Sequence, residues 1–352
     1  MPLLARMLAT PLAVDVRPGA IAGLAALLAE GKISSGGHVA VLVGPGQGEE
    51  IAAALHPQLD NATIFPVTDG TVDAARQLAD KLMSSSFDAV VGIGGGRTLD
   101  VAKYTASLVG QPMVSVATNL SHDGIASPVA SLIHEGRKGS FGVHIPIAVF
   151  VDLDYVRRAP PRLVRAGIGD AVSNISALAD WRLAADERGE TVDGLAASFA
   201  RAGALALLDR RDSIESTEFL TLLAESLVLS GLAMAVAGNS RPCSGSEHEV
   251  LHAIDQLFPG TSNHGELAGM AALFCTFLRG DTDHARTLDA CLRRHELPRT
   301  PADLGLSSEQ FVDAVVHAPS TRPDRYTILE HLALDRADVT KRLDEFLAAY
   351  GR

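Results

Sequence analysis

The chain has 352 residues, of which 47% are hydrophobic and 20% are charged, and its formal net charge is −12. This length predicts two domains, and the apolar content is sufficient for a large core, which excludes a disordered protein. The acidic balance argues against binding to nucleic acid or to a membrane surface, because both require a basic face. We therefore expect no nucleic-acid partner.

The N-terminal residues 1–14 are mildly apolar and are interrupted by Pro11. We interpret them as the first β-strand rather than as a signal peptide. No apolar run reaches the roughly 18 residues that are needed to span a bilayer, so we expect no membrane insertion. The three cysteines form no CxxC pair, which is typical of a protein in the reducing cytoplasm, its predicted location.

Short apolar segments alternate with amphipathic helical patterns in the first half of the chain. The strand candidates are residues 38–44, 62–67, 89–95, 113–118 and 147–153. Between them, apolar residues recur at helical spacing. The strands are apolar throughout, which favours a parallel sheet that is covered on both faces. This alternation predicts an α/β, Rossmann-like N-terminal domain over residues 1–159.

From about residue 160 the pattern is helical, with long stretches rich in Ala and Leu. We predict an all-α C-terminal domain over residues 160–352. The segment RPDRY, residues 322–326, is expected to be a loop within it.

Two glycine clusters follow predicted strands. Gly94, Gly95 and Gly96 come at the end of residues 89–95, before a helical pattern, and Gly44 opens a second cluster over residues 44–48. Glycines let a backbone approach a ligand closely, and a following helix N-terminus favours an anion such as a pyrophosphate. The alternative is a tight strand–helix turn. No GK[ST] follows, so this is not a Walker loop, and the two clusters together favour a dinucleotide.

Polar residues crowd the loop after the strand at 113–118, on the same edge as the glycine clusters. They are Thr118, Ser121, His122, Asp123 and Ser127. They are explained either by turn chemistry or by contact with a ligand.

Histidines in the second half indicate a metal site. His248 and His252 are four residues apart and lie on one face of a predicted helix, and His264 follows twelve residues later. Asp170 adds an acid that follows a glycine-containing stretch. One carboxylate and two imidazoles suit Zn²⁺ or Fe²⁺. The string His248–His252 also spells HExxH, so a metalloprotease remains an alternative, as do surface histidines without a metal.

Several motifs resemble those of the sn-glycerol-1-phosphate dehydrogenase family, within the wider group of iron-containing alcohol dehydrogenases, glycerol dehydrogenases and dehydroquinate synthases. The motifs are GGGRTLDVAKY, TNLSHDGIASP, APPRLVRAGIGDAVSNISALADW, RPCSGSEHEVLHAID and NHGELAG. The resemblance runs from the first strand to about residue 275. It implies a Rossmann-like domain and a helical domain, with the active site in the cleft between them.

The resemblance also implies residue roles. Asp170, His248 and His264 would bind the metal, while Asp170, Asp123 and His252 would contact the substrate. Asp123 and His252 are the candidate catalytic residues, with His252 a candidate proton relay. The residues that would bind the cofactor are Gly44, Gly94, Gly95, Gly96, Asp100, Thr118, Ser121 and Ser127.

The implied activity is the interconversion of sn-glycerol 1-phosphate, or a close polyol-phosphate analogue, and dihydroxyacetone phosphate. It would use NAD or NADP and one divalent metal, with Zn²⁺ as the first choice and Fe²⁺ or Ni²⁺ as alternatives. The partner is then a small phosphorylated polyol or ketone, and a homo-oligomer is expected. The alternatives are another polyol or phosphonate dehydrogenase, a dehydroquinate-synthase-like cyclase, and a non-catalytic nucleotide sensor. Asp170 favours a dehydrogenase, since the cyclases carry Glu at this ligand.

A phosphorylated substrate requires cationic groups. The candidates are Arg137, Lys138, Lys103 and Arg241, although ordinary solvated charge would explain each of them. Arg97 and Leu120 depart from the family pattern, and the bulk of Leu120 would reshape the cofactor or substrate pocket.

Overall fold

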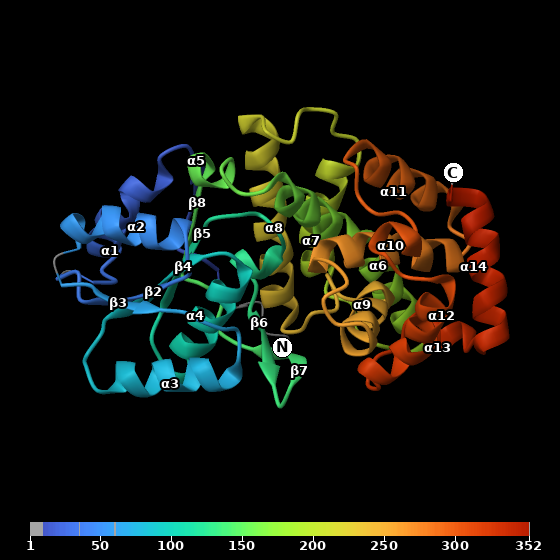
Figure 1. Cartoon of the computed structure of the whole chain (residues 1–352), viewed down its shortest axis with the longest axis horizontal. Coiled ribbons are helices and arrows are strands. Elements are labelled where there is room, and N and C mark those ends of the chain that lie inside the picture. Colours follow the sequence, from blue (N-terminus) through green and yellow to red (C-terminus); the bar gives the residue numbers. More distant parts are fainter. Residues whose placement is uncertain (1–9, 35, 60, 352) are drawn as a thin grey trace, which may run out of the picture. The chain divides into compact units, whose positions relative to one another are not determined.

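The computed structural model describes residues 10–34, 36–59 and 61–351. The chain divides into two compact units (Figure 1). The first, here called the sheet unit, comprises the residues up to Leu120 together with Gly124–Ala159. The second, the helical unit, comprises Ser121–Asp123 and the residues from Pro160 onward. The predicted boundary between residues 159 and 160, as a boundary between independently folding domains, stays a prediction.

The sheet unit is built on six strands in the order β1-β8-β5-β4-β2-β3, and every neighbouring pair is parallel. The strands are β1 (Ala13–Arg17), β2 (Val39–Val43), β3 (Thr63–Pro66), β4 (Ala89–Gly94), β5 (Met113–Ala117) and β8 (Ala148–Asp152). The predicted parallel Rossmann-like sheet is confirmed. The first strand begins later than predicted, at Ala13, and residues 1–9 of the predicted strand lie outside the described residues.

Helices cover the sheet on both faces, as the uninterrupted apolar strands predict. Every residue of β2, β4, β5 and β8 is buried. Helices α1 (Leu24–Glu30) and α2 (Gln47–Leu55) share one core with alternate strand residues such as Val41 and Val91. Helices α3 (Val72–Met83) and α4 (Gly96–Val109) lie on the opposite side (Figure 1).

An antiparallel hairpin in the sheet unit is absent from the sequence-based prediction. It consists of β6 (Val129–His134) and β7 (Arg137–Gly142). Its two-residue turn places Glu135 at φ 50° and Gly136 at φ 75°, as the tight turns of hairpins require. The short elements of the chain before residue 160 are η1 (Ala20–Gly23), η2 (His56–Gln58), η3 (Asp123–Ile125) and α5 (Leu153–Val156).

The helical unit contains no strand among its described residues, which confirms the all-α prediction. Its elements are α6 (Pro161–Arg188), α7 (Gly194–Leu208), α8 (Thr217–Ala237), α9 (Ser246–Leu257), α10 (His264–Leu278), α11 (Thr282–Arg294), η4 (Pro301–Leu304), α12 (Ser308–His317), η5 (Ala318–Thr321), α13 (Ile328–Leu332) and α14 (Arg336–Tyr350). The segment 322–326 is a loop, as predicted.

Helix α8 corrects one expectation from the sequence. By length and composition it contains an 18-residue window apolar enough to cross a membrane, with a mean hydropathy of 2.0, whereas no such run was expected. Within the helical unit, 67% of that window is buried. Its long apolar surface is therefore that of a core helix, packed against α6 and α7.

Candidate active site

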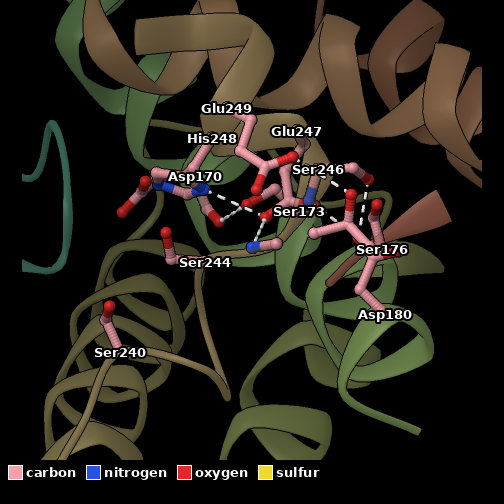
Figure 2. Close-up of polar contacts among 12 residues, drawn as sticks. Asp170, Ser173, Ser176, Asp180, Ser240, Ser244, Ser246, Glu247, His248 and Glu249 are labelled. Atoms are coloured by element: carbon pink, nitrogen blue, oxygen red, sulfur yellow. Dashed lines mark hydrogen bonds and ion pairs between the residues drawn. The ribbon is translucent and has the colours of Figure 1, made fainter. Parts of the chain in front are cut away.

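Three helices bring the predicted metal ligands together within the helical unit. Asp170 lies in α6, His248 in the first turn of α9, and His264 at the first position of α10. Their ligand atoms all lie within 4.8 Å of one another. Figure 2 shows Asp170 and His248 converging among the polar residues around the beginning of α9.

The distances between these donor atoms fit a divalent metal. The two Nε2 atoms of His248 and His264 are 3.2 Å apart, and Nε2 of His264 lies 3.5 Å from Oδ1 of Asp170. Four ligands arranged tetrahedrally around zinc at its usual bond lengths are separated by about 3.3 Å. The separations of His264 from His248 and from Asp170 are therefore close to those of ligands around one zinc ion, and all three donor atoms lie within 4.8 Å of one another.

Glu247 prepares His248 for this role. Its Oε1 lies 3.0 Å from Nδ1 of His248 and also accepts a hydrogen bond of 2.5 Å from the backbone amide of Gly245. The Glu247 side chain is completely buried, and these hydrogen bonds hold the pKa of Glu247 below its ordinary value in spite of its burial. An ionised Glu247 keeps the proton of His248 on Nδ1, which leaves the Nε2 lone pair available to a metal.

The electrostatics of Asp170 also favour a cation. Burial, together with the nearby charge of Asp123, raises the pKa of Asp170 well above its ordinary value in the absence of an ion. A divalent cation at this position offsets both effects, because it stabilises the ionised carboxylate.

Two glycines allow α6 and α10 to approach closely enough to share the site. A Cβ atom at Gly265 would lie 1.8 Å from the carbonyl oxygen of Ala166, and one at Gly169 would lie 2.2 Å from the carbonyl oxygen of Gly265. These glycines are the immediate neighbours of the ligands Asp170 and His264. The close backbone contact therefore fixes the separation of the two ligands.

The remaining predicted residues of the helical unit surround this cluster. The backbone amide of Asp123 donates to Oδ2 of Asp170 at 2.8 Å, and the ring of His122 lies 5.8 Å from that of His264. His252 lies one turn after His248, with 6.3 Å between the ring centroids. It is not among the three clustered ligands, so the structure does not arrange the HExxH string as a pair of zinc-binding histidines.

Asp180 organises the helix that carries both His248 and His252. Its Oδ2 accepts hydrogen bonds from the amide and the hydroxyl of Ser246, at 2.7 and 2.6 Å, at the beginning of α9 (Figure 2). Its Oδ1 accepts a hydrogen bond of 2.8 Å from the amide of Ile328 at the beginning of α13 and pairs with Arg279 at 2.5 Å. Sequence reasoning did not identify Asp180 or Glu247 as parts of the site.

In the sheet unit, the two glycine clusters flank the point at which the strand order reverses. The chain runs from β2 to β3 on one side and then to β4 on the other side of β2. Ligands of doubly wound sheets bind outside the carboxyl ends of the strands at such a point. Residues 44–48 and Gly94–Gly96 follow these two neighbouring strands.

The geometry of these loops depends on glycine. A Cβ atom at Gly44 would lie 2.3 Å from Oγ1 of Thr98, and one at Gly95 would lie 2.5 Å from Nδ2 of Asn119. No side chain caps the N-terminus of α2 or α4, whereas Thr71 caps α3 through the amide of Ala74. The free amides at the two uncapped termini suit a pyrophosphate.

Three of the other residues predicted to bind the cofactor form contacts within the protein. Asp100 is buried and pairs with the fully buried Lys103 at 3.0 Å. Lys103 in turn contacts the hydroxyl of Ser127 at 3.4 Å. The amide of Thr118 donates to the carbonyl of Gly94, and Ser121 groups with the helical unit. The proposed contacts of these residues with a cofactor stay predictions.

The cationic residues that the sequence suggested for a substrate phosphate are not the ones that lie near His252. Arg137 and Lys138 are exposed on β7, and Arg241 forms a two-pronged ion pair with Glu190. By contrast, Arg322 donates to Nε2 of His252 at 2.8 Å, with Arg325 nearby. The sequence predicts a loop at residues 322–326 but indicates no role for its two arginines. The signal that could have found them is two arginines in a loop that ends directly before a helix capping box at Thr327.

A parallel sheet with a glycine-rich strand–helix crossing, together with an Asp–His–His cluster on a helical unit, is the combination that a metal-dependent, nucleotide-linked dehydrogenase requires, and the fold is that of the iron-containing alcohol dehydrogenases. The model of the family described as iron-containing alcohol dehydrogenase matches residues 15–160. Two solved structures share the fold. Glycerol dehydrogenase from Schizosaccharomyces pombe superposes with a TM-score of 0.79 at 19% identity, covering 99% of this chain and 91% of the other. Maleylacetate reductase from Agrobacterium tumefaciens gives 0.75 at 16% identity and covers 98% of each chain.

Closer relatives narrow the assignment. The glycerol-1-phosphate dehydrogenase [NAD(P)+] of Hyperthermus butylicus is 38% identical over 328 residues, which cover 91% of this chain and 92% of the relative. The protein of the same name from Archaeoglobus fulgidus is 39% identical over 272 residues, covering 75% of this chain and 77% of the relative. The chain belongs to the glycerol-1-phosphate dehydrogenase family.

Proposed function

We propose that this chain interconverts sn-glycerol 1-phosphate and dihydroxyacetone phosphate, using NAD(H) or NADP(H). The observation that carries the proposal is the convergence of Asp170, His248 and His264 in a member of this family. The substrate is a small molecule, and a cytoplasmic homo-oligomer without nucleic-acid or membrane contacts is part of the same proposal. Of the candidate metals, Zn²⁺ is proposed first, because one carboxylate and two imidazole donors suit it.

In the oxidative direction, the carbinol carbon loses a hydride with its electron pair to the nicotinamide, and the hydroxyl loses a proton. Asp170, His248 and His264 would hold the divalent metal, which when bound would supply a Lewis acid for the substrate hydroxyl. Glu247 contributes by holding the ring of His248 in one orientation and one tautomer.

His252 is proposed to exchange the hydroxyl proton. Arginine only donates hydrogen bonds, so Nε2 of His252, which receives the bond from Arg322, carries the lone pair. A neutral His252 therefore carries its proton on Nδ1. It can take up the hydroxyl proton only at Nε2, after the hydrogen bond from Arg322 is released, and we assign the exchange to that atom. Asp123, whose amide is bonded to Asp170, is the second candidate for this role.

The test follows absorbance at 340 nm while purified, metal-replete protein is offered dihydroxyacetone phosphate with NADH or NADPH. Consumption of the reduced nucleotide that stops on chelation and returns with added Zn²⁺ is the expected result. A metal-replete protein that leaves both nucleotides unchanged would contradict the proposal. Conversion of a substrate without net change in the nucleotide would instead favour a cyclase.

A further inference from the structure

Two guanidinium groups from one loop lie together beside His252 in the helical unit. Arg322 donates to the hydroxyl of Ser244 and to Nε2 of His252, both at 2.8 Å. Arg325 donates to the hydroxyl of Ser240 at 2.6 Å and to the carbonyl oxygen of Ser244. Both arginines are only partly buried, so each retains accessible surface.

Neither arginine forms a direct ion pair with a carboxylate in the described part of the chain. Within the described residues, no carboxylate lies within ion-pairing distance of Arg322 or Arg325, and every hydrogen bond they make is to a neutral acceptor. Two other arginines of the same unit behave differently, since the buried Arg241 pairs with Glu190 and the partly buried Arg279 with Asp180. Two adjacent, partly buried cations that form no direct ion pair repel each other, although Glu249 and Glu247 lie close enough to offset part of their charge, and a bound anion reduces the remaining cost.

The lowered pKa values of the two arginines also favour a bound anion. Burial, followed by repulsion from Arg322 and Arg241, lowers the pKa of Arg325 to about 10. Burial also lowers the pKa of Arg322. A dianion between the two groups would reverse these effects, because it favours the protonated guanidinium.

The position of the pair relative to the metal ligands suits a small phosphorylated substrate. His252 contacts Arg322 directly, and its ring lies 6.3 Å from the ring of the metal ligand His248. A polyol phosphate carries its reacting hydroxyl and its phosphate only a few bonds apart. Both ends of such a molecule therefore find partners along one turn of α9.

We propose that Arg322 and Arg325, oriented by the hydroxyls of Ser244 and Ser240, form the phosphate-binding subsite of this enzyme. The assignment rests on the proposed function for the identity of the substrate, but not for the binding of an anion. Guanidinium groups bind phosphate oxygens through paired, charge-assisted hydrogen bonds, which gives orientation as well as affinity. Arg241, by contrast, already has a carboxylate partner in Glu190.

The test compares Arg325→Gln with wild type and with Arg336→Gln, which removes an exposed arginine of α14 that pairs with Asp313. Isothermal titration calorimetry of the metal-loaded protein with inorganic phosphate measures binding without turnover. We expect Arg325→Gln to weaken phosphate binding about 10- to 100-fold, as expected for the loss of charged hydrogen bonds, and Arg336→Gln to leave it unchanged. Arg325→Lys should recover part of the loss.

A kinetic measurement separates the subsite from the reaction. The ratio of kcat/KM for dihydroxyacetone phosphate to that for dihydroxyacetone should fall 10- to 100-fold in Arg325→Gln. Equal phosphate affinity in wild type and Arg325→Gln would overturn the subsite. If wild type binds phosphate through Arg325 but does not reduce dihydroxyacetone phosphate, the subsite stands and the proposed function fails. Should Arg325→Gln not fold, Ser240→Ala provides the same comparison with a smaller expected loss of about threefold.

Discussion

The two units of this chain specify their sites in different ways. In the helical unit, side chains from α6, α9 and α10 form the candidate metal site, and their donor atoms lie within 4.8 Å of one another. In the sheet unit, backbone amides and the absence of Cβ atoms define the candidate nucleotide loops. A side-chain site depends on residue chemistry at a few positions, whereas a backbone site depends on loop shape. Substitutions in the two units should therefore impair different ligands.

The largest expected effect is that of His264→Ala, which removes one of the three metal ligands. We expect loss of bound metal and a decrease in kcat/KM on the order of 10³-fold, because the Lewis acid contributes several kcal/mol of transition-state stabilisation. Metal analysis and the 340 nm assay measure the two effects. His284→Ala, at an exposed histidine of α11, serves as the control. Full activity in a metal-free His264→Ala protein would refute the proposed mechanism.

Gly265→Ala tests whether the backbone contact between α6 and α10 holds the metal site. The new methyl group would overlap the carbonyl oxygen of Ala166, so the two helices must separate. We expect the free energy of unfolding to fall by about 1–3 kcal/mol and the metal to bind more weakly. Chemical denaturation and metal titration measure these changes. Gly194→Ala, where no atom lies within 4 Å of the added Cβ, should do neither.

Glu247→Gln tests the orientation of His248 without removing a ligand. The amide retains the shape of the side chain but loses the charge that fixes the proton on Nδ1, so metal affinity should fall 10- to 100-fold. Competition with a chelator of known affinity measures it. Glu225→Gln, at an exposed carboxylate of α8, is the matched control. Unaltered affinity in Glu247→Gln would show that the hydrogen bond to His248 does not support the metal.

Gly44→Ala tests the candidate nucleotide loop of the sheet unit and has the smallest expected effect. Its Cβ would displace Thr98 at the beginning of α4, and we expect the dissociation constant of the nucleotide to rise about tenfold while metal content stays unchanged. Fluorescence titration with NADH and NADPH measures this change. Adding Thr98→Ala removes the overlapping hydroxyl and should restore part of the affinity. A change in metal content in Gly44→Ala would contradict the separation of the two sites.

The structure brings together the three metal ligands predicted in the helical unit, Asp170, His248 and His264, whereas the individual cofactor residues predicted in the sheet unit stay predictions. Histidine and aspartate have few alternative uses in a buried cluster, so Asp170, His248 and His264 were recognisable from their chemistry and from a family resemblance. A glycine has several uses. Gly44 and Gly95 both avoid overlap with neighbouring side chains, and no local pattern distinguishes that role from contact with a ligand.

The residues that the sequence did not reveal are those whose role depends on contacts between distant segments. Asp180 looks like an ordinary acid in an amphipathic helix, and its contacts with Ser246 and Ile328 span 66 and 148 positions. Arg322 lies 70 residues from His252. The β6–β7 hairpin was missed for a different reason, because its exposed, polar second strand lacks the apolar run that identified the other strands.

The contacts of Asp180 also bear on how this enzyme could diversify. One carboxylate secures the first residues of two helices, one carrying the reactive imidazoles and the other following the arginine loop. The loop 322–326 is therefore followed at once by a fixed helix end. If the proposed phosphate subsite holds, exchanging residues 322–326 for a neutral sequence, with Asp180 retained, should lower the preference for phosphorylated over unphosphorylated polyols without unfolding α9.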